Sequence, residues 1–390
     1  MDISIVIVSY NTKEYLIECL QSLHTNSFEG TSEVFVVDNA SSDGSADMVE
    51  RRFPGVSLIK NDVNAGFSAA VNQSCRRASG RYVLLLNPDT LVLSGAIGAL
   101  FSYMESHPEV GAAGPRQWLD TDKRLQSTVT VKPPDSTTLL AQIPFFRRWV
   151  QKTLHTKFWS KDFDIWTSNF PIRVDTLNGS CMLVRRKTIE DVGVLDEDFF
   201  LFFEDADWCV RMRKRGWELW FVPASEIVHF GMRSVLLSEG ISEIARQSLN
   251  HYIKKHMSPS GYLLWKIFGA KRLLRPIKRL ILGIKNVYPL GMPEKSGPHR
   301  KTSDGDVTLF WNPEEVASGY LFEISTDPLF LYKAGTVCRN SHIRLPLDLV
   351  RQGPKGPLLW RVAPVYEKKR LGVFTGPYHF SLEKAEKEDS

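Results

Sequence analysis

The most constraining feature of the sequence is an alternation, in its first ninety residues, between short aliphatic runs and stretches of helical spacing. The runs are rich in β-branched residues and comprise Ile3–Val8, Glu33–Val37, Val56–Ile59 and Tyr82–Leu86. Such runs favour strands, and strands that alternate with helices build βαβ units. We therefore expect an α/β fold with a mixed, mostly parallel sheet and flanking helices, which is a Rossmann-like arrangement.

Polar residues occur where each expected strand ends and where each expected helix begins. Ligands of such sheets bind outside the carboxyl ends of the strands, so a site is to be sought in the loops that follow them. Those loops begin at Ser9, Asp38, Asn61 and Asn87. The candidate helix N-caps are Thr12, Ser45, Ser68 and Ser94.

Composition is that of an ordinary globular protein. The chain has 390 residues, of which 43% are hydrophobic, and a formal net charge of +5. At about 150 residues per domain, this length predicts two or three domains. The balance excludes a wholly disordered chain and a collagen, and five scattered cysteines without a C-x-x-C pair favour a reducing compartment. The apolar start lacks a basic n-region, so it predicts a strand rather than a signal peptide, and a soluble or peripheral protein.

No glycine-rich phosphate-binding motif follows the first run. The absence of G-x-G-x-x-G and of G-x-x-x-x-G-K-[ST] argues against a dinucleotide oxidoreductase and a P-loop enzyme. Ser9 and Asp38 follow the first two runs instead, and the Asp38 carboxylate could accept hydrogen bonds from a nucleotide base or a ribose. It could equally form an Asx-turn that leads into the next helix. Asn64 and Gly66 have the same two interpretations, as pocket residues or as turn residues.

Carboxylates and a histidine supply the remaining candidate chemistry. Asp89, in an N-P-D motif, suits a hard cation that holds a diphosphate, although a proline turn with a capping aspartate is the alternative. Glu204 and Asp205 follow an apolar run, which raises carboxylate pKa values and suits a general base. Acids are also common in a first helical turn. His229 is either a metal ligand or an ordinary core histidine.

Taken together, these motifs resemble the family 2 glycosyltransferases of the GT-A fold. The ordered set is S-Y-N, V-D-N-A-S-x-D-G-S, N-x-G-F, N-P-D, N-G-S-x-M-L-x-R-R, E-D-x-D-W and a final His. Within the family the chain is most similar to the rhamnosyltransferase-like subgroup. The resemblance covers roughly residues 1–235.

The resemblance implies a donor pocket and a cation site. It implies that Asp38 contacts the base or ribose of a nucleoside diphosphate-sugar, with Ser9 and Asn64 in the same pocket. It also implies that Asp89 and His229 bind a divalent cation, Mg²⁺ or Mn²⁺.

One position departs from the family's D-x-D motif. Asn87, which also belongs to the implied donor site, stands where the first acid is expected. A neutral amide contributes less to cation binding than a carboxylate does.

The resemblance further implies the base and the acceptor side of the site. Asp205 is implied as the catalytic base, with Glu204 beside it. The residues implied to face the sugar or the acceptor are Asn178, Gly179, Asp207 and Trp208, with Ser180 in the same loop as the first two.

The implied activity is that of an inverting, metal-assisted glycosyltransferase (a hexosyltransferase). It would move a sugar, rhamnose in the subgroup, to a hydroxyl of a glycan or lipid-linked glycan in cell-surface polysaccharide synthesis. The same-class alternative is transfer of a galactosyl or N-acetylhexosaminyl group from a UDP donor. A nucleotidyltransferase would usually have a glycine-rich, basic N-terminal loop, which is absent. A non-catalytic carbohydrate-binding protein is suggested only by the C-terminal region.

The pattern changes at Val307 to short alternating runs, which predict an all-β domain of about 80 residues. Trp311 and the phrases EISTDPLF and WRVAPV resemble a fibronectin type III or similar sandwich. We therefore expect a GT-A catalytic domain at residues 1–235, a basic helical segment at 236–300 and a fibronectin type III-like β-sandwich at 301–385.

Basic residues concentrate between the two expected domains. Residues 251–301 contain twelve Lys or Arg and one acid. Residues 271–284 place apolar and basic side chains on opposite helical faces, which predicts either an interfacial helix on an anionic membrane or a helix packed on the catalytic domain. We expect a cytoplasmic protein, peripheral at the inner face of the cell membrane. No nucleic acid is expected, because the rest of the chain is acidic and has no recognition motif.

Overall fold

The computed structural model describes residues 1–130, 163–231, 241–269, 299–301, 307–314, 316–325, 333–345, 358–366, 370–371 and 375–380. The chain divides into two compact units. The first contains Met1–Pro133 and Ser168–Tyr252, and the second contains Pro134–Thr167 and Ile253–Ser390. The three-part division expected from the sequence stays a prediction.

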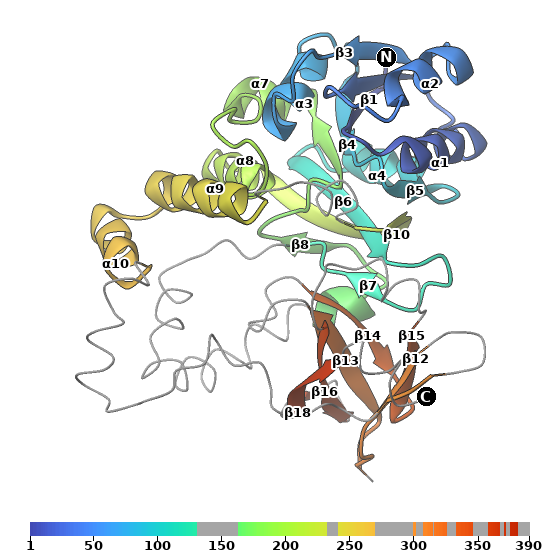
Figure 1. Ribbon diagram of the computed structural model, residues 1–390, viewed down its shortest axis with the longest axis vertical. Helices are drawn as coiled ribbons and strands as arrows, with labels where there is room; N and C mark the ends of the chain where they lie inside the picture. Colours follow the sequence, from blue (N-terminus) through green and yellow to red (C-terminus); the bar gives the residue numbers. More distant parts are fainter. Residues whose placement is uncertain are drawn as a thin grey trace. The chain divides into compact units, whose positions relative to one another are not determined.

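A mixed sheet forms the centre of the first unit (Figure 1). Its strands are β1 (Ile3–Ser9), β2 (Ser32–Asp38), β3 (Ser57–Lys60), β4 (Tyr82–Leu86), β6 (Val110–Trp118), β9 (Cys181–Arg185) and β10 (Glu218–His229). They lie in the order β3-β2-β1-β4-β9-β6-β10. All neighbouring pairs are parallel except those of β9, which is antiparallel to β4 and β6. The expected mostly parallel sheet and its first four strands are confirmed.

Helices cover both faces of this sheet. They are α1 (Lys13–Thr25), α2 (Ser45–Arg52), α3 (Phe67–Cys75), α4 (Ala96–Ser106), α7 (Arg186–Val192) and α8 (Glu204–Lys214). Alternate residues of a strand face opposite sides, so Ile5 of β1 packs in one core with Leu16 of α1 and Leu100 of α4, whereas Val6 is buried on the other face. Figure 1 shows α3, α7 and α8 on the opposite side of the sheet from α1 and α4.

Three helix N-caps are glycines and not the serines expected from the sequence, which lie within two residues of them. Gly44, Gly66 and Gly95 precede α2, α3 and α4 with φ angles of +80°, +85° and +73°. Positive φ is strained for residues with a Cβ and nearly free for glycine, so glycine begins these helices. Thr12 does precede α1, but its hydroxyl shares a hydrogen bond with Ser9 and caps nothing.

Strand β10, at the end of the strand order, is bent and brings His229 to the carboxyl edge of the sheet. The pairing of β10 with β6 shifts register between Val222 and Glu226. Near its start β10 pairs with β8 (Ile172–Val174), and at its end with β5 (Thr90–Val92). His229 is therefore opposite Thr90, directly beside the loop that follows β4. A further short strand, β7 (Gln126–Ser127), pairs with β6.

Two helices follow β10 in the described residues. Helix α9 (Ile241–His256) lies mainly in the first unit, and α10 (Pro259–Gly269) lies in the second. No helix in the described part of the chain has the length and apolar character needed to cross a membrane. The expected basic helix at 271–284 lies outside the described residues.

The described strands of the second unit are antiparallel and form two sheets. One sheet contains β11 (His299–Lys301), β12 (Val307–Phe310) and β15 (His342–Leu345). The other contains β13 (Gly319–Ser325), β14 (Lys333–Cys338), β16 (Leu358–Tyr366), β17 (Arg370–Leu371) and β18 (Thr375–Phe380). Trp311, next to β12, contacts the rings of Tyr320 and Trp360 at centroid distances of 5.6 and 6.4 Å. The expected C-terminal β region is confirmed, and its likeness to fibronectin type III stays a prediction.

Candidate active site

The ends of β1 and β2 bring the first two predicted donor residues together. Ser9 is opposite Asp38 in the parallel register, and both residues are buried. Asp38 Oδ2 accepts a hydrogen bond from the N–H of Ser41 at 3.1 Å, which is the Asx-turn that the sequence allowed. Asp38 Oδ1 is buried without a hydrogen-bond partner among the described residues. Since an unsatisfied buried oxygen is costly, an N–H or O–H of a bound nucleotide fits this position.

An asparagine that the sequence reasoning missed connects this pocket to the Asn64 loop. Asn39, only 2% exposed, donates to Asn64 Oδ1 at 2.8 Å. Its own Oδ1 accepts hydrogen bonds from Asn61 Nδ2 and from the N–H of Ala65, both at 3.0 Å. Asn64 therefore lies beside Asn39 at the end of β2, and its side-chain oxygen is already used in shaping the loop. Its place in a donor pocket stays a prediction. Asn39 directly follows Asp38 in the V-D-N motif, and that adjacency is the signal that could have identified it.

The loop after β4 and the end of β10 form the candidate cation site. Asp89 Oδ1 and His229 Nε2 are 3.3 Å apart, and both side chains are at most 9% exposed. The N–H of Phe230 donates to the carbonyl of Asp89 at 3.0 Å, which fixes the two chain segments to each other. Asn87 Nδ2 is 3.4 Å from the same imidazole nitrogen. Three side chains predicted for the donor and cation sites are therefore adjacent.

The spacing of these atoms fits one bound cation. Two neighbouring ligand atoms of an octahedral ion, each about 2.1 Å from it, are about 3 Å apart. The Asp89 oxygen and the His229 nitrogen come close to this separation. His229 Nδ1 is buried and has no hydrogen-bond partner among the described residues, so the polar contacts of the imidazole with Asp89 and Asn87 are made through Nε2. An aspartate with a histidine suits Mn²⁺ or Mg²⁺, and Asn87 can add only a neutral ligand.

Glu204 and Asp205 begin α8 and have unusual protonation behaviour. Burial raises the pKa of Glu204 well above its usual value, and the adjacent Asp205 carboxylate raises it further. Burial also raises the pKa of Asp205, but hydrogen bonds from the N–H groups of Gly179 and Ala206, at 2.9 and 2.7 Å, partly offset this. Glu204 Oε2 has no such partner among the described residues. The pair therefore favours a protonated Glu204 beside an ionised Asp205.

The loop before β9 connects the carboxylate pair to the loop after β4. Gly179 donates its N–H to Asp205 Oδ2 at 2.9 Å, and the next residue, Ser180, accepts a hydrogen bond from the N–H of Asn87 at 2.8 Å. Asn178 holds the turn by accepting the N–H of Ser180 at 2.9 Å. The hydroxyl of Ser180 bonds to Gln117, which is 1% exposed. Sequence reasoning missed Gln117, because nothing near it in the chain marks it as part of a site.

Strained backbone accompanies these loops. Among the described residues other than glycine, five have positive φ, and four of them are Asn11, Ala40, Phe202 and Phe203. The first two follow Ser9 and Asp38 by two residues each, and the last two directly precede Glu204. Each such residue costs about 1–3 kcal/mol, and residues of this kind cluster at functional sites. The strain supports the assignment of the loops after β1 and β2, and of the segment before α8, to one site.

Two predicted sugar- or acceptor-facing residues are instead inside the protein. Asp207 and Trp208 are both 0% exposed. Asp207 pairs with Arg211 at 2.8 Å, and the indole N–H of Trp208 donates to the carbonyl of Gly193 at 2.8 Å. Trp208 and the Asp207-paired Arg211, which donates to the carbonyl of Val194, hold α8 against the chain segment that follows α7. The prediction that Asp207 and Trp208 face a sugar or an acceptor is therefore wrong.

Residues 1–256 match the family described as "Glycosyltransferase like family 2". The chain belongs to this glycosyltransferase family. Membership agrees with the mixed, mostly parallel sheet and with the order of the motifs along the chain. The protein is therefore a glycosyltransferase with the GT-A catalytic fold, as the sequence predicted.

Several curated relatives are rhamnosyltransferases. The chain is 28% identical over 294 residues to N-acetylglucosaminyl-diphospho-decaprenol L-rhamnosyltransferase of Mycobacterium tuberculosis, which covers 69% of this chain and 90% of that one. It is also 28% identical over 233 residues to rhamnosyltransferase WbbL of Escherichia coli, covering 58% of this chain and 82% of that one. The predicted likeness to the rhamnosyltransferase-like subgroup is confirmed.

Some solved structures are similar to the chain at lower identity. S. aureus TarS 1-349 is 15% identical with a TM-score of 0.41, covering 68% of this chain and 78% of that one. Mannosyltransferase PcManGT from Pyrobaculum calidifontis, in complex with GDP-Man and Mn²⁺, is 15% identical with a TM-score of 0.40, covering 71% and 82%. These overlaps are weak and add nothing to the family membership.

Proposed function

We propose that this enzyme transfers rhamnose, with inversion, from a nucleoside diphosphate donor to a hydroxyl of a lipid-linked glycan. The two rhamnosyltransferase relatives support the sugar. The name of the mycobacterial relative, which contains a diphospho-decaprenol acceptor, supports the lipid link. Cell-surface glycan synthesis is the process in which such an acceptor is used.

The observation that carries this proposal is the two-residue link through Gly179 and Ser180. One of these neighbours bonds to Asp205 at 2.9 Å, and the other bonds to Asn87 at 2.8 Å. The candidate base is thus held at a fixed position relative to the loop that contains Asp89. An inverting transfer needs a base held in place relative to the donor, because the acceptor hydroxyl attacks from the face opposite the leaving diphosphate.

The protein's own residues each have a task in this mechanism. Asp38 Oδ1, unpartnered in the pocket, accepts a hydrogen bond from the nucleotide. Asp89 and His229 would hold a divalent cation, which when bound neutralises charge on the diphosphate. Asp205 accepts the proton of the acceptor hydroxyl while the acceptor oxygen bonds to the anomeric carbon. The nucleoside diphosphate leaves with the electron pair of the broken C–O bond. Gly179 orients the Asp205 carboxylate through its N–H.

A donor panel tests the proposal. We expect acceptor-dependent release of nucleoside diphosphate to be fastest with a rhamnose donor and a polyprenyl-diphosphate-linked sugar. The measurement is the rate at which nucleoside diphosphate is released from rhamnose, galactose and N-acetylhexosamine donors at equal concentrations. Turnover only with the UDP-linked galactose or N-acetylhexosamine donors would replace rhamnose by the alternative sugar. The absence of acceptor-dependent release with every donor would contradict the proposal as a whole.

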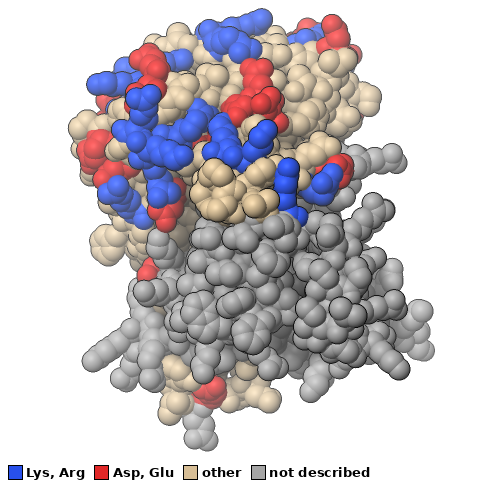
Figure 2. Space-filling model, turned by 90° about the vertical axis from the view of Figure 1, so that its left-hand side faces the viewer, with Lys and Arg blue, Asp and Glu red and all other residues tan. Residues whose placement is uncertain are grey.

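A membrane-surface location would give this enzyme access to a lipid-linked acceptor. We infer that it works on the cytoplasmic side, at an anionic inner leaflet, through residues 271–284. A second basic surface lies on the first unit, where exposed Arg213, Lys214 and Arg215 end α8. Figure 2 shows the left-hand side of the molecule as drawn in Figure 1, and Lys and Arg side chains gather on this face of the first unit. The sequence of residues 271–284 predicts a helix with positive charge on one face and apolar side chains on the other, and insertion at a membrane surface requires both.

Co-sedimentation with anionic vesicles separates the two basic surfaces. Changing Arg275, Lys278 and Arg279 to Glu is expected to abolish binding at low salt, because each well-placed cation contributes about 1 kcal/mol at such a surface. The matched control changes the three basic residues at the end of α8 to Glu, and it should bind like the wild type. Equal binding by all three proteins, or binding by none, would refute the membrane role of residues 271–284.

A further inference from the structure

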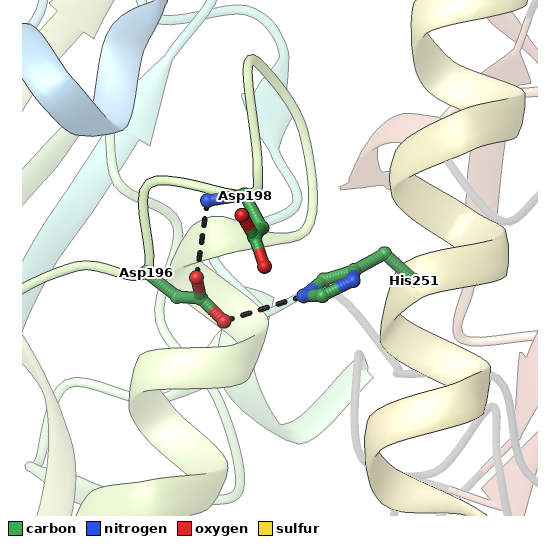
Figure 3. A group of neighbouring side chains, drawn as sticks. All are labelled: Asp196, Asp198 and His251. Carbon is green, nitrogen blue, oxygen red and sulfur yellow. Dashed lines mark hydrogen bonds and ion pairs between the residues drawn. The ribbon is translucent and has the colours of Figure 1, made fainter.

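Two aspartates and a histidine meet at a place separate from the residues of the candidate active site (Figure 3). Asp196 and Asp198 lie in the loop that leads to α8, and His251 lies on α9. Each side chain offers one ligand atom, and these atoms all lie within 4.8 Å of one another. Asp196 Oδ2 is 3.3 Å from His251 Nε2, and Asp196 Oδ1 accepts the N–H of Asp198 at 3.0 Å. The three side chains point toward one common space.

Contacts around this Asp–Asp–His cluster hold the loop and α9 together. The Phe199 ring packs edge-on against the His251 imidazole, with centroids 4.5 Å apart. About one turn earlier on α9, the Ser248 hydroxyl donates to the carbonyl of Leu201 at 2.7 Å. The imidazole and the loop are therefore positioned by the protein's own contacts, and such preorganisation lowers the cost of binding a ligand.

An ion pair alone does not explain the cluster. It would account for Asp196 and His251 but not for Asp198, whose carboxylate has no hydrogen-bond or ion-pair partner among the described residues. Two carboxylates this close repel each other, and a divalent cation between them removes the repulsion. Two carboxylate oxygens with one imidazole nitrogen form a donor set that suits a transition-metal ion such as Zn²⁺ or Mn²⁺.

We propose that Asp196, Asp198 and His251 bind a divalent transition-metal ion that cross-links the loop before α8 to α9. Ligand atoms of a tetrahedral zinc ion, about 2.1 Å from the metal, are about 3.4 Å apart. The Asp196 and His251 atoms already have this separation, and the exposed Asp198 carboxylate lies within 4.8 Å of both. Water completes the coordination.

Such a cross-link would act on the segment that follows the loop, at the start of α8. The loop ends at the strained residues Phe202 and Phe203, and the next two residues are the carboxylate pair at the start of α8. The same loop also contacts the first residue of α3, which follows the Asn64 loop, since the N–H of Phe67 donates to the carbonyl of Phe200 at 2.7 Å. An ion at the Asp–Asp–His cluster would stabilise the placement of this segment without contacting substrate.

Zinc binding measured by calorimetry tests the site in a chain that lacks the proposed catalytic cation ligands. In an Asp89→Ala/His229→Ala background we expect one Zn²⁺ per chain and a rise in melting temperature on adding Zn²⁺. Adding Asp198→Asn should weaken this binding at least tenfold and remove the rise. This readout needs no turnover, so it fails or succeeds independently of the proposed transferase function.

Two further variants make the outcome decisive. His251→Ala should also lose the ion, and Asp198→Asn keeps the test valid if that variant unfolds, because Asp198 is exposed and its replacement has the same shape. Glu197→Gln is the matched control: its carboxylate bonds to Asn72 and Arg76 rather than to the cluster, so zinc affinity should not change. No bound zinc in the background chain, or equal affinity with Asp198→Asn, would overturn the proposal.

Discussion

Asp205→Asn is expected to lower sugar transfer by about 10²–10⁴-fold while the donor still binds. Asparagine has the same shape and can still accept the N–H of Gly179, so the loop before β9 keeps its position. It cannot take a proton from the acceptor hydroxyl, which is the step assigned to Asp205. The measurement is the single-turnover transfer rate, with donor affinity determined separately by calorimetry.

The pH profile and a neighbouring variant provide the control. Burial raises the pKa of Asp205, so wild-type transfer should rise with pH through a value above the usual aspartate range and then level off. This acid limb should disappear in Asp205→Asn. Glu204→Gln should cost less than tenfold and keep the limb, because glutamine imitates the protonated form that burial favours for Glu204. A larger loss in Glu204→Gln than in Asp205→Asn would exchange the two roles.

The alternating fold of the first unit could be predicted because each element has a local signal. The run at Ile3–Val8 is aliphatic, short and bounded by polar residues, and it forms β1 with one residue more. The helix starts were predicted less well, because serine is a common N-cap and the decisive feature was backbone conformation. Gly44 and Gly95 adopt positive φ there, which no pattern of side-chain polarity reveals.

The candidate site was predictable where its residues end or follow strands, and not where they lie inside a strand. Asp38 ends β2 and Asp89 lies in the loop after β4, and both strands are parallel to β1, so the topology alone brings these residues to one edge of the sheet. Gln117 lies within β6 and bonds to the hydroxyl of Ser180, 63 residues away in the sequence. That contact depends on the antiparallel pairing of β9 with β6, which the sequence gives no means of placing.

The wrong prediction for Asp207 and Trp208 of the E-D-x-D-W motif has a geometric cause. On a helix with 3.6 residues per turn, Asp207 lies about 200° around the axis from Asp205, so the two cannot face one site. A motif read as a string suggests that its members act together, whereas the helix sends half-buried Asp205 toward the Gly179 loop and Asp207 into the protein. Trp208, the largest side chain of the motif, fills the core beside α8.

Asp89→Ala is expected to lower transfer by at least about 10²–10³-fold, because charge on the leaving diphosphate is then no longer neutralised. Wild-type protein should bind nucleoside diphosphate more tightly with Mn²⁺ than without it. In Asp89→Ala this gain should vanish, while the metal-independent affinity persists, since Asp38 and its neighbours are untouched. Calorimetric titration with and without Mn²⁺ measures both quantities.

Asn87→Asp is the matched gain-of-charge variant at the same cation site. The side chain of Asn87 is 3.4 Å from His229 Nε2, so a carboxylate there would stand beside the two proposed ligands. We expect it to tighten Mn²⁺ binding, because a third ligand side chain would be present and a second one would be anionic. Unchanged Mn²⁺ dependence in both Asp89→Ala and Asn87→Asp would mean that the cation, if the reaction uses one, is held elsewhere. The 3.3 Å contact between Asp89 and His229 would then be an ion pair that fixes the end of β10.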